Sequence, residues 1–96
     1  MKKIKLMADY HCYPLWDMSQ GNYGDIDPAS LPISIKLKED LIKWSEIYNN
    51  TLDLDNPQKA GFKDNEDEEI FKLEGKRLAE RLKEELGEEY IVMTKL

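Results

Sequence analysis

Two adjacent residues, His11 and Cys12, are the side chains in this sequence that could most readily support catalysis. An imidazole that takes the proton of a neighbouring thiol creates a nucleophile. In an extended chain, however, adjacent side chains point to opposite sides, so a turn would have to bring the two together. Zinc would need three or four ligands, whereas the chain has one histidine and one cysteine. We therefore predict no catalytic residue, no cofactor and no metal.

Two groups of carboxylates have spacings that can be compared with those of cation-binding sites. Counted from Asp53 as a calcium loop, the fifth residue is Pro57, the sixth is Gln58 instead of Gly, and the twelfth is Asp64 instead of Glu. These acids are therefore interpreted as turn residues. A second group lies among Gly- and Pro-containing turns, and its spacing establishes no ligand geometry: Asp17, Asp25 and Asp27.

Aromatic residues are concentrated near the N-terminus, where four lie within fourteen positions. Tyr10 falls on an apolar register and Trp16 could pack beneath a helix, but Tyr13 and Tyr23 fit no such register. Exposed Tyr and Trp beside acids are typical of protein-binding hot spots. We predict that the following residues bind a protein partner: Tyr13, Trp16, Asp17, Tyr23, Asp25 and Asp27.

The net charge of −6 is concentrated in the C-terminal third, because residues 64–89 contain eleven acids and five bases. Such a chain lacks the Lys and Arg clusters with which proteins bind phosphate backbones, so nucleic acid is not an expected partner. An acidic surface suits a basic protein instead. The acids at the start of the second helix form a second predicted partner-binding patch: Glu66, Asp67 and Glu69.

The length of 96 residues suits one domain, residues 1–96, that buries roughly 60 to 65% of its unfolded surface. No apolar run approaches the roughly 20 residues that span a bilayer, so no membrane association is expected. The N-terminus has no signal-peptide pattern and the single cysteine excludes an internal disulfide. We predict a cytoplasmic protein.

Strict alternation from Lys3 to Tyr10 predicts a strand with Ile4, Leu6, Ala8 and Tyr10 on its buried face. Residues 10–14 predict a reversal, and residues 15–18 a short second strand. Because Pro14 donates no backbone hydrogen bond, this second strand is placed at a sheet edge. Residues 19–30 have turn formers and no periodicity, which predicts a surface loop. Alternation over residues 90–96 predicts a last strand.

Two amphipathic helices are expected between the second and last strands. Ser34 is the expected N-cap of the first helix. Its apolar stripe comprises Leu37, Leu41, Trp44, Tyr48 and Leu52. Ile35, Ile42 and Ile47 widen or flank that stripe. Asp64 is the cap of the second, and its stripe comprises Phe71, Gly75, Leu78, Leu82 and Leu86. Gly87 ends that helix. Its charges predict solvated ion pairs, namely Glu68 with Lys72, Lys76 with Glu80, and Arg81 with Glu85.

These elements predict the α+β class, as a two-layer β-β-α-α-β domain. A small three-stranded sheet has two antiparallel helices on one face. We expect the strand order 2-1-3, with the last strand parallel to the central first one, and the meander 1-2-3 is the alternative. The other sheet face, with Lys3, Lys5, Met7 and Asp9, would be open to solvent or to a partner.

The residues Met7-Ala-Asp-Tyr-His-Cys-Tyr-Pro-Leu-Trp16, with Ile26-Asp-Pro and Leu31-Pro-Ile-Ser34, resemble a family of short bacterial proteins. The resemblance continues through Trp44, Tyr48, Asn56-Pro57, Gly61-Phe62, Glu74-Gly75 and Leu78-Ala79. It contains no catalytic motif, and glycine is expected where this chain has His11. Proteins of this kind resemble immunity proteins of bacterial contact-dependent inhibition, which neutralise a toxin domain by binding it.

The sequence thus predicts a binding protein, most concretely an immunity protein that is a monomer or weak dimer and occludes a basic toxin domain, such as a nuclease. One alternative is a small enzyme or ligand-binding domain that uses Asp9, His11, Cys12 and Asp17, which would have to converge in a pocket. Another is a regulatory module that associates through its open sheet face or edge strand.

Overall fold

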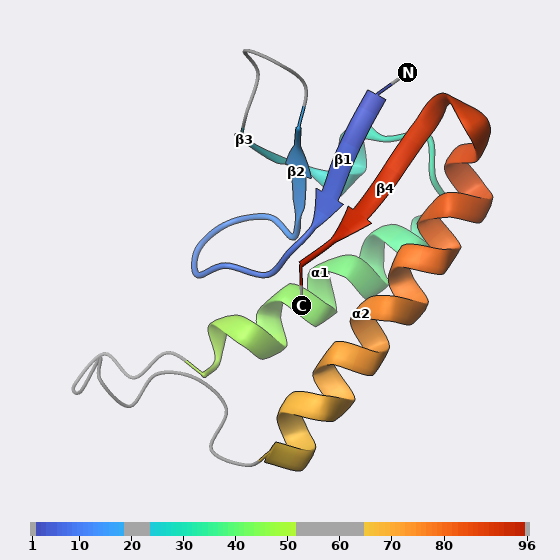
Figure 1. The fold of residues 1–96 in the computed structure, drawn as a ribbon. Coiled ribbons are helices and arrows are strands. Elements are labelled where there is room, and N and C mark those ends of the chain that lie inside the picture. Colours follow the sequence, from blue (N-terminus) through green and yellow to red (C-terminus); the bar gives the residue numbers. More distant parts are fainter. Residues whose placement is uncertain (1, 19–23, 52–64, 96) are drawn as a thin grey trace.

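The computed structural model describes residues 2–18, 24–51 and 65–95. Figure 1 shows the strands and helices in chain order, which are β1 (Lys2–Leu6), β2 (Leu15–Asp17), β3 (Gly24–Ile26), the short 3₁₀ helix η1 (Pro28–Ser30), α1 (Ile35–Asn49), α2 (Asn65–Leu86), the 3₁₀ turn η3 (Gly87–Glu89) and β4 (Tyr90–Thr94). Leu52, Asp64 and the segment compared with a calcium loop, which starts at Asp53, lie outside the described residues. The α+β class is confirmed.

The four strands form one mixed sheet in the order β3-β2-β1-β4. β4 is parallel to β1, with Ile4 beside Val92, and β2 is antiparallel to β1. This arrangement confirms the order 2-1-3 for the three predicted strands. The sheet nevertheless has a fourth strand, β3, within the segment that we expected to be a surface loop, and it pairs with β2.

The prediction that β2 lies at a sheet edge is therefore wrong, because β2 lies between β1 and β3. Pro14 does not prevent this position, since it precedes the first residue of β2 and its carbonyl still accepts a hydrogen bond from the Met7 N–H at 2.9 Å. β3 has three residues, too few to show alternation, and its pairing with Trp16 and its neighbours defines it as a strand. Pairing of main-chain groups leaves no signature in side-chain spacing.

Both helices pack on the same face of the sheet, and the core lies between the two layers (Figure 1). The predicted stripes supply most of it. Its buried members are Ile4, Leu6, Leu15, Ile33, Leu37, Leu41, Trp44, Phe71, Leu78, Ala79, Leu82, Leu86 and Val92. In the part of the chain that the structure describes, no helix is both long and apolar enough to span a membrane.

The helices are antiparallel, as predicted, because residues near the start of α1 contact residues near the end of α2. Ser34 caps α1 through its hydroxyl, which accepts a hydrogen bond from the Leu37 N–H at 3.2 Å. That hydroxyl donates to Oε2 of Glu85 at 2.9 Å, and the Ser34 N–H donates to Oε1 of the same carboxylate. The carboxylate of Glu85 thus lies at the positive end of α1. At the end of α2, Gly87 has φ +72° and stops the helix as expected.

Arg81 also reaches across to α1, where its Nη1 lies 2.6 Å from Oδ2 of Asp40. Lys36 lies 3.1 Å from the other oxygen of Asp40. The pairing of Arg81 with Glu85, expected from their spacing along the helix, is replaced by these contacts between the helices. The predicted pair of Glu68 with Lys72 is present at 3.5 Å.

Candidate functional site

Four aromatic rings join the turn between β1 and β2 to both helices. Tyr10 stacks on Tyr48 with ring centroids 4.6 Å apart, and Tyr48 lies 5.8 Å from Phe71. Phe71 stacks in turn on Trp44 at 4.3 Å, and the indole N–H of Trp44 donates to the Phe71 carbonyl at 3.0 Å. Burial of Tyr48 and its contact with Tyr10 raise the pKa of its phenol. These rings fix the turn relative to α1.

The turn itself has an unusual residue at its tip. His11 has φ +60°, a left-handed conformation that glycine adopts most readily. The backbone turn for which glycine was expected is therefore formed here by histidine. The His11 N–H donates to Oδ1 of Asn49 in α1 at 3.0 Å, and the Tyr10 N–H donates to Oδ1 of Asp9 at 2.8 Å. Side chains thus hold the turn against the end of α1.

A hollow of about 360 Å³ opens between this turn, β3 and α1. Tyr13 lies at its edge with 41% of its surface exposed. The Tyr13 N–H donates to Oδ2 of Asp25 in β3 at 3.0 Å, which ties the turn to the sheet edge. The lining comprises His11, Cys12, Tyr13, Asp25, Ile42, Ser45, Glu46 and Asn49. The structure therefore brings Tyr13 and Asp25, both predicted partner-binding residues, to one surface.

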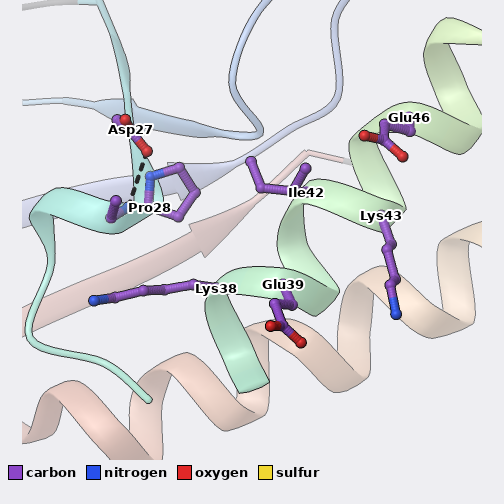
Figure 2. A pocket seen from close by; sticks show the side chains of 8 residues that line it. Asp27, Pro28, Lys38, Glu39, Ile42, Lys43 and Glu46 are labelled. Atoms are coloured by element: carbon purple, nitrogen blue, oxygen red, sulfur yellow. Dashed lines mark hydrogen bonds between the residues drawn. The ribbon is translucent and has the colours of Figure 1, made fainter. Parts of the chain in front are cut away.

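A second hollow of about 360 Å³ adjoins the first, since Ile42 and Glu46 line both. It is drawn in Figure 2, where Ile42 extends from α1 on the side of η1. Its lining comprises Asp27, Pro28, Ala29, Lys38, Glu39, Ile42, Lys43 and Glu46. Oδ1 of Asp27 accepts a hydrogen bond from the Ala29 N–H at 2.9 Å and so caps η1. We call the two adjoining hollows the α1 groove.

The α1 groove combines an apolar strip with an excess of carboxylates. Ile42 is half-buried at its centre, and Tyr13 supplies an exposed ring at one end. Four acids line the groove against two lysines: Asp25, Asp27, Glu39 and Glu46 against Lys38 and Lys43. Such a surface suits a partner segment that offers both apolar and basic side chains.

The thiol of Cys12 lines this groove. Its burial, with the nearby carboxylates of Asp9 and Asp25, raises its pKa above the usual value, so the thiol stays protonated. The enzyme alternative required Asp9, His11, Cys12 and Asp17 to converge in one pocket. His11 and Cys12 line this hollow, whereas Asp9 and Asp17 are not in its lining. Residues 2–18, 24–51 and 65–95 contain no group of three His, Cys, Asp or Glu that could hold a metal ion.

Trp16 and Asp17 lie in β2, away from the groove lining. Trp16 is 8% exposed, and its indole N–H donates to the Met7 carbonyl at 2.9 Å. It does not pack beneath α1 as we expected. Its neighbour Leu15 points into the core, so Trp16 lies on the opposite face of the sheet, beside Lys5. Asp17 is half-buried opposite Ile4, and Tyr23 lies outside the described residues.

The second predicted patch lies in the first turns of α2, where Glu66, Asp67 and Glu69 are exposed. Asp67 lines a separate hollow between α1 and α2. The two predicted patches are therefore not one surface. One borders the flank of α1 that faces the turn and β3, and the other borders the flank that faces α2.

The residues that sequence reasoning missed are on the sides of α1. Ile35, Ile42 and Ile47 were expected to widen or flank the buried stripe, but Ile35 is 74% exposed and Ile47 50% exposed. Ile42 lies in the α1 groove, with Glu46 and Asn49 one and two turns away. The sequence could have indicated an exposed apolar surface here, because isoleucines that fall outside the buried stripe of a helix lie next to its charged side.

Comparison with known proteins places the chain in a family. No curated protein matches it. A family model described as "Serratia CdiI immunity protein-like" matches residues 2–94, which include every strand and helix described above. The chain therefore belongs to the Serratia CdiI immunity protein-like family.

Proposed function

We propose that this protein protects the cell that makes it by binding a toxin domain in the cytoplasm through the α1 groove and blocking its activity. The observation that supports this surface is the position of Tyr13, exposed beside the carboxylates of Asp25 and Glu46. Exposed aromatic rings surrounded by hydrogen-bonding and charged groups are the usual centres of protein interfaces.

The toxin domain has a basic surface where it meets the groove. The acids of the groove outnumber its lysines, and the chain as a whole has a net charge of −6. A nuclease would present such a surface, because it binds phosphate backbones with Lys and Arg. An acidic inhibitor that covers this surface competes with the nucleic acid and associates rapidly by electrostatic steering.

The test uses the toxin domain encoded by the gene adjacent to that of this chain. Cells that produce the toxin domain should grow when they also produce the wild-type chain, and calorimetry of the purified pair should give a 1:1 complex. Tyr13→Ala with Asp25→Asn should weaken binding at least tenfold, because the first removes the exposed ring and the second removes a charge.

The test variant is chosen to leave the fold intact, and a control variant changes charge outside the groove. Asp25→Asn retains an oxygen that can accept from the Tyr13 N–H, so the turn remains tied to β3. Glu84→Gln removes one exposed charge from α2, outside the groove, and should leave the affinity unchanged. Equal affinity of the wild type and the Tyr13/Asp25 variant would falsify the assignment of this surface, and failure of the wild-type chain to bind or protect would reject the toxin partner.

A further inference from the structure

The seam between α1 and α2 is closed at one end and open at the other. Near the start of α1, Asp40 and Arg81 close it with a hydrogen-bonded ion pair. Towards the other end of α1, a hollow of about 300 Å³ opens over the stacked rings of Trp44 and Phe71. Its lining comprises Trp44, Ile47, Asp67, Ile70, Phe71 and Glu74. We call it the seam hollow.

The seam hollow is apolar at its base and acidic at its rim. Ile47 is 50% exposed and Ile70 64% exposed, and Leu73, one turn along α2 from Ile70, is 59% exposed. Ile47 and Ile70 share the lining of this hollow, so together they form more apolar area than scattered single residues do. The charged residues of the lining are Asp67 and Glu74, both acids, and Oε2 of Glu74 lies 3.7 Å from Nη1 of Arg77 in a solvent-exposed pair that a partner's cation can replace.

The seam hollow and the α1 groove lie on opposite flanks of one helix. Ile42, in the groove, and Ile47, in the seam hollow, are five positions apart, which places them about 140° apart around α1. A stable interface covers roughly 800 Å² on each partner, more than one small hollow provides. A partner seated in the groove can reach the seam hollow by crossing the outward side of α1.

Resting on the function proposed above, we infer that the seam hollow is the second half of the toxin interface and accepts an apolar side chain of the toxin domain that is flanked by Lys or Arg. The apolar side chain would cover Ile47 and Ile70, and the basic groups would lie against Asp67 and Glu74. A second copy of this chain fits less well, because it would bring its own Asp67 and Glu74 against these carboxylates.

The experiment measures the affinity for the adjacent-gene toxin domain by calorimetry. Ile70→Lys should raise the Kd at least tenfold, since it places a cation where the basic segment binds. Ile35→Lys is the matched control, because Ile35 is more exposed than Ile70, belongs to neither lining, and should leave the Kd within twofold. The double variant Asp67→Asn with Glu74→Gln should reduce the dependence of the Kd on salt, and Glu80→Gln with Glu84→Gln should not.

The outcomes separate this inference from the proposed function. Wild-type binding with an unchanged Kd for Ile70→Lys overturns the seam hollow alone. A change in the sedimentation of the free chain caused by Ile70→Lys would make a second copy the occupant. A lower unfolding temperature of the free variant with an unchanged Kd would make a segment of this same chain the occupant. Either of these two occupants, a second copy or a segment of the same chain, overturns the inference. If the wild-type chain does not bind the toxin domain, both proposals fail.

Discussion

The hollows on the two flanks of α1 are bounded in different ways. In the α1 groove, the opposing side is made of turns, and side chains hold these turns through main-chain N–H groups. Asn49 accepts from the His11 N–H, and Asp25 accepts from the Tyr13 N–H. In the seam hollow, the opposing side is a helix, and the base is a pair of stacked rings, Trp44 and Phe71.

This difference determines how each surface should respond to substitution. Two of the four groove carboxylates have two roles, since Asp25 and Asp27 both hold main-chain groups and contribute charge. Acids at the rim of the seam hollow lie on a helix whose backbone is held by its own hydrogen bonds. We therefore expect changes in the groove to alter shape as well as affinity, and changes at the seam rim to alter affinity alone.

The largest expected effect is at the base of the seam hollow. Trp44 is 1% exposed, so Trp44→Ala should lower the free energy of unfolding by about 3 to 5 kcal/mol. Tyr13→Ala, at the exposed edge of the groove, should change it by less than about 0.5 kcal/mol. Urea unfolding followed by circular dichroism measures both. Similar losses for the two variants would remove the distinction between a buried base and an exposed edge.

Substitutions of the side chains that hold the turn should have intermediate effects. Asn49→Ala and Asp25→Ala each remove the acceptor of a main-chain N–H and should cost about 0.5 to 1.5 kcal/mol. Amide hydrogen exchange should accelerate at His11 in the first variant and at Tyr13 in the second. Glu74→Gln, at the seam rim, should change stability by less than about 0.5 kcal/mol. Unchanged exchange at the two amides would show that the turn is held by other contacts.

A smaller effect, of opposite sign, is expected at the tip of the turn. His11→Gly should raise the free energy of unfolding by about 0.5 to 1 kcal/mol, because glycine adopts positive φ without the steric cost that histidine meets. His11→Ala keeps the Cβ atom and should give no gain. The same urea titrations report both values, and a glycine variant less stable than wild type would mean that the imidazole itself stabilises the turn.

The smallest effect concerns pH and the closed end of the seam. Hydrogen bonds from Arg81, and then from Lys36, hold the pKa of Asp40 below its usual value of 3.8. A carboxyl whose pKa is lower when folded stabilises the protein above its unfolded pKa, and this contribution disappears as the pH falls through the folded value. Asp40→Asn should therefore be less stable than wild type at pH 7, with the difference shrinking below about pH 4.

Thermal unfolding at a series of pH values would follow this difference between Asp40→Asn and wild type. The control is Glu80→Gln, which removes an exposed carboxylate on α2 that pairs with Lys83. A stability difference for Asp40→Asn that stays constant from pH 7 to pH 3 would contradict a lowered pKa. It would also leave the closed end of the seam without an electrostatic explanation.

The sequence predicted the parts of the fold that depend on the spacing of side chains. Alternation around Ile4 and Leu6 gave β1, and the stripes through Leu41 and Leu78 gave the buried sides of the helices. Ser34 and Gly87 marked helix ends because capping is a local interaction. The parallel pairing of β1 and β4 followed from the number of chain reversals between them.

The candidate site was predicted in part. Tyr13, Asp25 and Asp27 line the α1 groove, but the residues opposite them, such as Ile42 and Glu46, were not identified. Trp16 and Tyr13 are three positions apart in the sequence, and for that reason we predicted them as parts of one surface. Because neighbouring residues of a strand point to opposite faces and Leu15 points into the core, Trp16 lies on the other face of the sheet. It is buried there and is separated from the exposed ring of Tyr13.

By itself, the sequence determined both helices, the strands β1, β2 and β4, the buried stripes of the helices and the acidic charge, because each depends on residues a few positions apart. The tertiary structure decided the pairing of β3 with β2, the partner of Arg81, and the carboxylate at the start of α1. Arg81 and Asp40 are 41 residues apart, and Glu85 and Ser34 are 51 apart. Contacts over such separations depend on how the packed layers place the helices, and no local periodicity encodes them.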